Sequence, residues 1–319
     1  PGPPHLAPEQ LARLIGQGRF AGQDVGLVVS PPEVQFFPLK LPEQALLQPP
    51  ERVEQALRFE VAQESRRAAD ELEVRYWRLP PGLAHRTNVM AVVLPSATAL
   101  EWSRALGEHD LHLKRIDVSA CALVRLARRQ WTPAESDLWG VLDLGLRHAT
   151  FTAVVGTVPA YVRTLSVAPH DWTRQIASAF EIPPPLAEQL KCAHGVQPTQ
   201  RGQRPAGGRD LLNAADLSSA VSSVLRDSLQ SLAQEVGRCM NYMLQSFPDL
   251  AAKRLVLAGG GAGLRGLPAM LEAELGIPVV RLASSGTDGP EWEHPLAGVE
   301  VDVRSACAVG GAMLDWEGV

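Results

Sequence analysis

The sequence predicts an α/β protein of two domains, on three observations. Short apolar strands alternate with amphipathic helices along most of the chain. The length of 319 residues favours two domains over one. The stretch LVLAGGGAGLRGLPAM (255–270) is typical of a buried strand, a turn of three glycines and a helix. Because a backbone without side chains allows another group to come close, this glycine corner is a candidate binding site.

The composition describes a globular protein without a basic surface. Hydrophobic residues make up 45% of the chain and charged residues 20%, and the net charge is −5, which excludes a general attraction to nucleic acid. No apolar run reaches the roughly 18 residues of a membrane-spanning helix, and no signal peptide is visible. The four cysteines lie far apart without a CxxC pair: Cys121, Cys192, Cys239 and Cys307. This spacing predicts buried thiols in a reducing compartment, and it predicts neither disulfides nor a zinc site.

The first part of the chain predicts helices and strands in mixed order. We expect helices at 6–15, about 50–69, 97–106 and 120–130. We expect strands at 24–30, 34–42, 72–79, 88–95 and 111–118, the first two joined by the PPE turn at 31–33.

The second part begins with the strand at 136–145 and predicts a hairpin sheet followed by helices. The expected further strands are 149–155, 158–165 and 276–284, the first pair joined by Gly156-Thr157 as a tight hairpin. The expected helices are 170–180, 185–193, a long one with a period of about 3.6 residues at 213–247, and 304–314. The stretches 197–210 and 285–299 predict loops, the first a mobile one.

Two short motifs are candidates for ligand binding. The glycine corner lacks the Gly-Lys-Ser/Thr of a phosphate-binding P-loop, and its GxGxxG frame at Gly261-Gly263-Gly266 is a weak signal because no acidic residue closes the next strand. Asp143-Leu144-Gly145 ends an apolar strand, where a carboxylate can hold the water shell of a divalent metal. For both motifs, an ordinary turn remains the alternative.

The order of these motifs resembles the second half of an actin-like ATPase, in which an Asp-x-Gly hairpin faces the phosphates and a glycine-rich strand end passes beneath the adenosine. Longer stretches narrow the resemblance to the PilM family of type IV pilus assembly proteins. They follow the order of that family along nearly the whole chain: LKLP (39–42), ERVEQALRFEVAQ (51–63), HDLHLKRIDVSACALVRL (109–126), AFEIPPPLAEQLK (179–191), LAQEVGRCMNYML (232–244) and LVLAGGGAGLRGLPAMLEAELGIPV (255–279).

The resemblance implies ATP and Mg²⁺ as cofactors and assigns a role to each matching residue. The adenosine side would comprise a lysine, a helical Glu-x-x-Arg pair for ribose and base, and the glycines: Lys191, Glu235, Arg238, Gly259, Gly260 and Gly261. The phosphate and metal side would comprise Asp143 and Gly145, with Asp143 toward the metal. Lys191 and Glu235 are equally well interpreted as solvated helix charges, and no catalytic residue is assigned.

Two departures from the family predict weak or lost ATP binding. The family's opening strands and first phosphate loop have no counterpart here, so the resemblance implies an N-terminally truncated FtsA/PilM-type actin-like fold. Asp24-Val25-Gly26 spells the loop motif, but its surroundings match a later strand pair, which makes Asp24 a loop residue before a strand. In the second loop, Leu146, Arg147, His148 and Ala149 replace the family's small hydroxylated residues.

The resemblance implies a first domain at 1–136, with an inserted subdomain at about 23–95, rejoined by the C-terminal helix at 303–319. The second domain would be 137–302, with a helical insertion at about 183–250. It also implies a short membrane-protein tail docking in a groove of the first domain, within 25–118. Candidate walls or core residues there are Phe36, Phe37, Tyr76 and Trp77.

The expected function is a cytoplasmic scaffold of a type IV pilus or type II secretion platform. It would lie at the inner membrane through partners, binding the cytoplasmic tail of a PilN-like protein, without nucleic acid or membrane insertion. The alternative is an active ATPase or a sugar-kinase-like phosphotransferase, which needs two phosphate loops and a general base. An FtsA-type filament protein would carry a C-terminal amphipathic membrane helix, which the ending AMLDWEGV does not predict.

Overall fold

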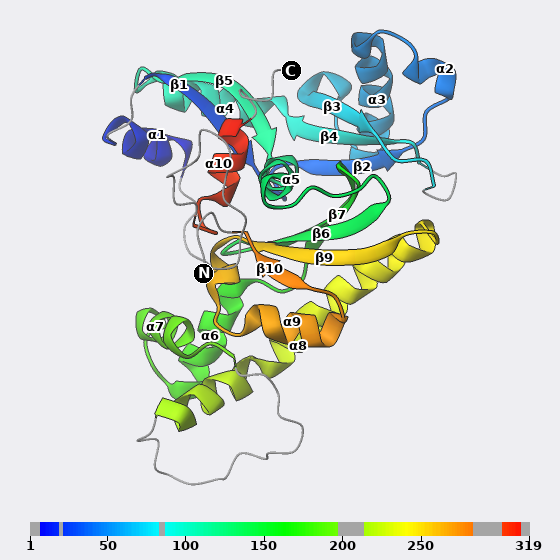
Figure 1. Cartoon of the computed structure of the whole chain (residues 1–319). Coiled ribbons are helices and arrows are strands. Elements are labelled where there is room, and N and C mark those ends of the chain that lie inside the picture. Colours follow the sequence, from blue (N-terminus) through cyan, green and yellow to red (C-terminus); the bar gives the residue numbers. More distant parts are fainter. Residues whose placement is uncertain (1–6, 19–21, 83–86, 197–213, 283–301, 314–319) are drawn as a thin grey trace. The chain divides into compact units, whose positions relative to one another are not determined.

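The computed structural model describes residues 7–18, 22–82, 87–196, 214–282 and 302–313 (Figure 1). The loops predicted at 197–210 and 285–299 lie outside these described residues. Contacts group the chain into two compact units. Unit 1 comprises Pro1–Arg125, Val158–Ala160 and Cys307–Val319, and unit 2 comprises Leu126–Thr157 and Tyr161–Ala306.

The strands of unit 1 form two separate sheets. They are β1 (Asp24–Val29), β2 (Gln35–Leu39), β3 (Leu72–Arg78), β4 (Val89–Pro95) and β5 (His112–Val118). β1 pairs in parallel with β5, whereas β4 lies between β2 and β3 and is antiparallel to both. The consecutive strands β1 and β2 therefore belong to different sheets. Asp24 is the first residue of β1 and pairs with His112, so its interpretation as a loop residue was wrong.

Helical segments alternate with these strands along unit 1. They are α1 (Pro8–Gly16), α2 (Glu43–Leu46), α3 (Pro50–Ser65), η1 (Ala69–Glu71), α4 (Ser96–Gly107), α5 (Ser119–Gln130), which runs on into unit 2, and α10 (Ala306–Ala312). In α3, Val53, Leu57 and Val61 recur every fourth residue and are buried in the core beside the three-stranded sheet. Each such side chain contributes about 1.5–3 kcal/mol on burial. Arg66 ends this helix in a left-handed conformation, φ 55°.

The aromatic residues predicted to be groove walls or core residues are partly buried and pack against the core clusters of unit 1. Phe36 and Trp77 meet edge to face, with ring centroids 6.3 Å apart. Phe37 and Tyr76 pack against the apolar cluster between α3 and the three-stranded sheet. All four residues therefore contribute to the packing of unit 1, and their role as groove walls stays a prediction.

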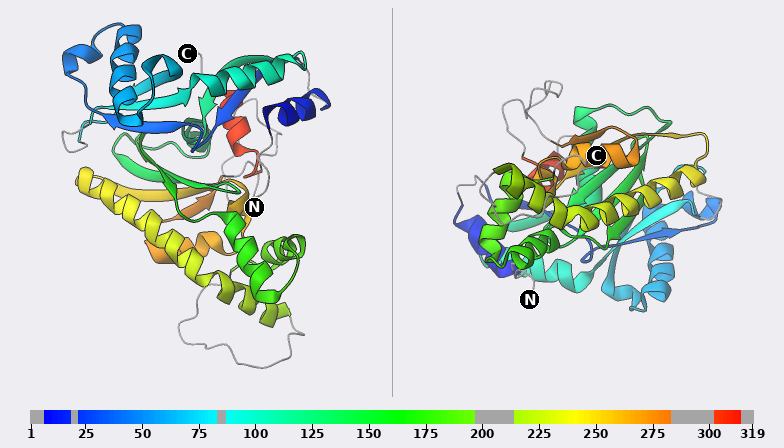
Figure 2. Two further views of the ribbon diagram at one scale, coloured as in Figure 1. Left: turned by 180° about the vertical axis from the view of Figure 1, so that it is seen from behind. Right: turned by 90° about the horizontal axis from the view of Figure 1, so that it is seen from below.

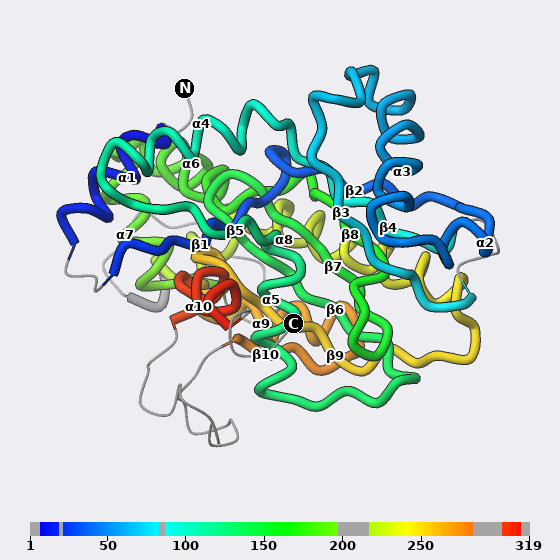
Figure 3. Tube along the Cα trace, turned by 90° about the horizontal axis from the view of Figure 1, so that it is seen from above, coloured from blue at the N-terminus to red at the C-terminus, as the bar shows by residue number. Residues whose placement is uncertain are grey.

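The C-terminal helix α10 lies beside β1 and α5 (Figure 3). Glycine permits this close packing, because a Cβ on Gly310 would lie 2.1 Å from the carbonyl oxygen of Ala122. Arg125 donates a hydrogen bond of 2.7 Å to the carbonyl oxygen of Gly310 and forms an ion pair of 2.9 Å with Asp117. The end of the chain thus rejoins the unit formed by its beginning.

Unit 2 is built on one mixed sheet in the order β10-β9-β6-β7-β8. Its strands are β6 (Asp137–Leu144), β7 (Ala149–Val155), β8 (Val158–Leu165), whose first three residues group with unit 1, β9 (Ala251–Ala258) and β10 (Val279–Arg281). β6 is antiparallel to β7 and parallel to β9, so the carboxyl ends of β6 and β9 lie at the same edge. These two ends carry the Asp-x-Gly motif and the glycine corner.

The helices of unit 2 are α6 (Pro169–Phe180), α7 (Pro184–His194), α8 (Ala214–Ser246) and α9 (Leu267–Leu275). Figure 2 shows α8 lying lengthwise across the sheet, with α6 and α7 beside its first half. The periodicity of α8 places a stripe of buried side chains in the core: Val221, Leu225, Leu229, Leu232, Val236, Met240 and Met243. Phe247, directly after the helix, is buried too. On the side of β8, the ring of Tyr161 contacts that of Tyr242, with centroids 5.3 Å apart.

No helix among the described residues is both long and apolar enough to cross a membrane. None of the four cysteines, all of which lie among the described residues, forms a disulfide. Their expected burial holds for Cys239, whereas Cys192 is exposed and the other two are partly buried.

Candidate functional site

Asp143 stands at the carboxyl end of β6, between two neighbouring strands. In the ladder it is opposite Thr150 of β7 and Ala258 of β9. Burial raises the pKa of its carboxyl group from 3.8 to about 6, because a low-dielectric environment disfavours the charged form.

The glycine corner begins directly after β9 and contains the 3₁₀ turn η2 (Gly260–Gly263). Gly259 has φ +79°, and a Cβ there would lie 2.5 Å from Oδ1 of Asp143. A Cβ on Gly261 would lie 2.5 Å from Cγ of Pro169, at the start of α6. These two glycines are therefore required by the packing of the protein itself. The structure brings the predicted Asp143 and the predicted glycines together.

Gly260 differs from its two neighbours in the open space beside it. It is exposed, and the nearest atom to an added Cβ would be Cγ of Arg304 at 3.9 Å. Among the predicted glycines, Gly260 is thus the position where another molecule can approach the backbone closely.

An arginine that the sequence analysis missed holds the corner in place. Nε of Arg281, on β10, donates a 2.8 Å hydrogen bond to the carbonyl oxygen of Ala262, and its Nη2 donates one of 2.9 Å to that of Leu264. The signal was a single arginine in an otherwise apolar strand after the corner. The corner is also joined to α7, since Val196 N–H donates to the carbonyl oxygen of Arg265 at 2.8 Å.

Lys191 is buried on α7, with 7% of its surface exposed, so its interpretation as a solvated charge was wrong. Its Nζ donates hydrogen bonds to Oγ1 of Thr173 at 2.8 Å and to Oε2 of Glu188 at 2.7 Å. Burial raises the pKa of Glu188, but hydrogen bonds from Lys191 and Thr173 outweigh this and lower it overall. The ammonium group of Lys191 is therefore engaged inside unit 2.

Glu235 and Arg238 lie on α8, where Glu235 anchors the helix to the end of β8. Its carboxylate accepts a 3.0 Å hydrogen bond from the backbone N–H of Ser166 and another from the Ser166 hydroxyl group. Arg238, almost one turn further along, is exposed.

The turn after Asp143 is compact. A Cβ on Gly145 would lie 2.9 Å from the carbonyl oxygen of His148, so glycine lets the turn close on itself. The backbone N–H of His170 donates a 2.9 Å hydrogen bond to the carbonyl oxygen of Leu146, which ties the turn to the first residues of α6. The side chain of Leu146 is 56% exposed, where the resembled family has a small hydroxylated residue.

Of the polar residues predicted to hold a nucleotide, Arg238 is exposed, whereas two others are engaged within the protein. The open face at Gly260 suits the close approach of a planar ligand. The predicted polar partners Lys191 and Glu235 already bond within the protein. The described residues contain no cluster of three side chains suited to a metal ion, although Mg²⁺ is often held by one or two carboxylates and water.

The fold belongs to the actin-like class of α/β folds. The structure is similar to a chain of a solved PilM–PilN type IV pilus biogenesis complex, with a TM-score of 0.72. The two sequences are 22% identical, and the match covers 98% of this chain and 89% of that chain. At this identity the likeness is one of fold, and it confirms the predicted PilM-like actin fold.

Two other solved structures are more distant. MreB 5 of Spiroplasma citri bound to AMPPNP has 14% identity and a TM-score of 0.47, covering 69% of this chain and 65% of that chain. A nucleotide-free diol dehydratase-reactivating factor has 15% identity and a TM-score of 0.47, and the match covers 84% of this chain and 49% of that chain. Neither likeness is close enough to bear on the site. No protein-family model and no curated protein matches the chain.

Proposed function

We propose that the chain is an actin-fold scaffold of a type IV pilus or type II secretion assembly platform at the inner membrane. It would bind the short cytoplasmic tail of a PilN-like membrane protein through the domain that we place at 1–136. The observation that carries the proposal is the likeness of nearly the whole chain, at a TM-score of 0.72, to a chain from a PilM–PilN type IV pilus biogenesis complex.

The state of the glycine corner supports a scaffold over an ATPase. Lys191 and Glu235 are held by Glu188 and Ser166, and Leu146 occupies the turn that would face phosphates. We propose that nucleotide binding is weak or lost and that the protein does not hydrolyse ATP efficiently. It would stay cytoplasmic and reach the membrane through its partner.

The test is a pull-down of the inner-membrane protein encoded beside this gene, with its cytoplasmic tail intact or deleted. We expect recovery of the intact form alone. Equal recovery of both forms would rule out tail docking. Recovery of neither form would remove the scaffold proposal.

A further inference from the structure

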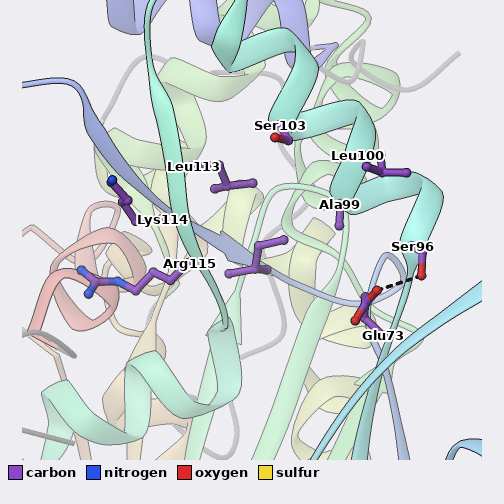
Figure 4. A pocket seen from close by; sticks show the side chains of 9 residues that line it. Glu73, Ser96, Ala99, Leu100, Ser103, Leu113, Lys114 and Arg115 are labelled. Carbon is purple, nitrogen blue, oxygen red and sulfur yellow. Dashed lines mark hydrogen bonds between the residues drawn. The ribbon is translucent and has the colours of Figure 1, made fainter.

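Figure 4 shows a pocket of unit 1 between α4 and β5, with a volume of about 390 Å³. Its lining residues lie within 25–118, the range that the family resemblance assigns to the docking of the membrane-protein tail. This pocket therefore belongs to the proposed function. Unit 2 carries a surface that the proposed function does not use, at the outer edge of the last strand of its sheet.

The outer edge of β8 is open to pairing with another strand. β7 pairs with one side of β8, and no described strand pairs with the other. Pro159 has no N–H to offer, and its carbonyl oxygen accepts a 2.7 Å hydrogen bond from Nε1 of Trp77, so it points away from β7. Backbone groups of a strand alternate in direction from residue to residue. The N–H and C=O groups of Tyr161 and Arg163 therefore also point away from β7.

Two cations lie beside this edge, on the side of α8. The ring of Tyr161 contacts that of Tyr242 on α8, so the side chain of Arg163, two residues further along the strand, lies on the same face. Arg163 and Arg238 are both exposed. Burial raises the pKa of the Cys239 thiol on α8, and the nearby charges of Arg163 and Arg238 both act to lower it. The two guanidinium groups therefore belong to one patch.

The charge of this patch favours an acidic partner over a second copy of the chain. Among the described charges that act on the Cys239 thiol, Arg163 and Arg238 are cations and Glu235 is an anion. The carboxylate of Glu235 is engaged, because it accepts hydrogen bonds from the backbone N–H and the hydroxyl group of Ser166. Two such patches would repel each other, whereas an acidic segment is attracted.

We propose that the outer edge of β8 binds an extended segment of a partner protein in which an acidic residue lies two positions from an aromatic or aliphatic residue. The segment adds a strand beside 161–163, through main-chain hydrogen bonds. Because side chains on one face of a strand are two residues apart, its carboxylate faces Arg163 and Arg238 while its apolar side chain packs on Tyr161 and Tyr242. This inference goes beyond the proposed function and does not depend on it.

The experiment selects phage-displayed random octapeptides on the full chain and measures their affinity for four variants. Arg163→Ala removes the charge and keeps the backbone N–H, whereas Arg163→Pro removes both without removing a bond to β7. Arg238→Ala removes the cation of α8 and leaves the strand unaltered. Arg226→Ala, at an exposed position about three turns earlier on α8, is the matched control. Thermal unfolding of each variant verifies that it is folded.

We expect enriched peptides in which Asp or Glu lies two residues from an aromatic or aliphatic residue. Their affinity should fall about two- to fivefold on Arg163→Ala and on Arg238→Ala, the size of an exposed ion pair. Arg163→Pro should weaken binding by a further factor of about two to ten, because one main-chain hydrogen bond is lost. Arg226→Ala should bind like the original chain.

Three results would overturn the inference: no enrichment, enrichment of basic peptides, or affinities that Arg163→Pro and the alanine variants at 163 and 238 leave unchanged. The first would mean that Pro159 and Arg163 only protect the edge from unwanted pairing. Concentration-dependent dimerisation of the chain that Arg163→Pro abolishes would assign the edge to a second copy instead. Because the selection does not use the membrane protein, its failure and the failure of the pull-down are distinguishable.

Discussion

Neighbouring glycines in the corner have different structural roles, although they are consecutive in the sequence. Gly259 adopts φ +79° against the carboxylate of Asp143, whereas Gly260 faces open space. One residue is needed for folding and the other is available for a ligand.

We therefore expect Gly259→Ala to lower the free energy of unfolding by about 1–3 kcal/mol, because it combines an unfavourable φ with a clash. Gly260→Ala, with its nearest neighbour at 3.9 Å, should change it by less than about 0.5 kcal/mol. Urea unfolding of both variants is the measurement. Equal losses would mean that the two positions are packed alike.

The carboxyl group of Asp143 should leave a signature in the pH dependence of stability. Its pKa is raised from 3.8 to about 6 in the folded state, so the folded chain binds this proton more tightly than the unfolded chain does. Stability from this group is then complete below pH 4 and falls as the pH rises through 6, by up to about 3 kcal/mol. Asp143→Asn removes the titration. Unfolding free energies from pH 4 to 7 should show a flatter profile for the variant, and parallel profiles would contradict this.

At the scale of elements, local patterns were predictive and long-range pairings were not. The period of α8 was visible in the sequence because one face of the helix is buried along most of its length. The turn at 31–33 gave no sign that β1 leaves β2 to pair with β5, because strand partners are chosen by packing far along the chain. Lys191 was ambiguous for the same reason, since Thr173 reaches it from a different helix.

Arg281 should set the rigidity of the whole corner. Arg281→Ala removes two hydrogen bonds to the carbonyl oxygens of Ala262 and Leu264, a loss of about 1–3 kcal/mol in total. We expect amide hydrogen exchange over 259–266 to accelerate at least tenfold, while exchange in α8 stays unchanged. Lys253→Ala, an exposed substitution at the start of β9, is the control. Unchanged exchange in the corner would show that the contact with α7 holds it alone.

At the scale of the whole molecule, an actin-like fold does not by itself establish ATP binding. We expect affinity for Mg²⁺–ATP weaker than about 1 μM, roughly −8 kcal/mol, and no phosphate release above background. The reason is that binding would first have to free Lys191 and Glu235 from their internal partners. Isothermal titration and a phosphate-release assay on the full chain measure both quantities. Gly260→Val is the control variant, because it fills the open face of the corner without meeting a close neighbour. Tight magnesium-dependent binding that this variant abolishes would show that the corner is a working nucleotide site and that its side chains rearrange to complete it.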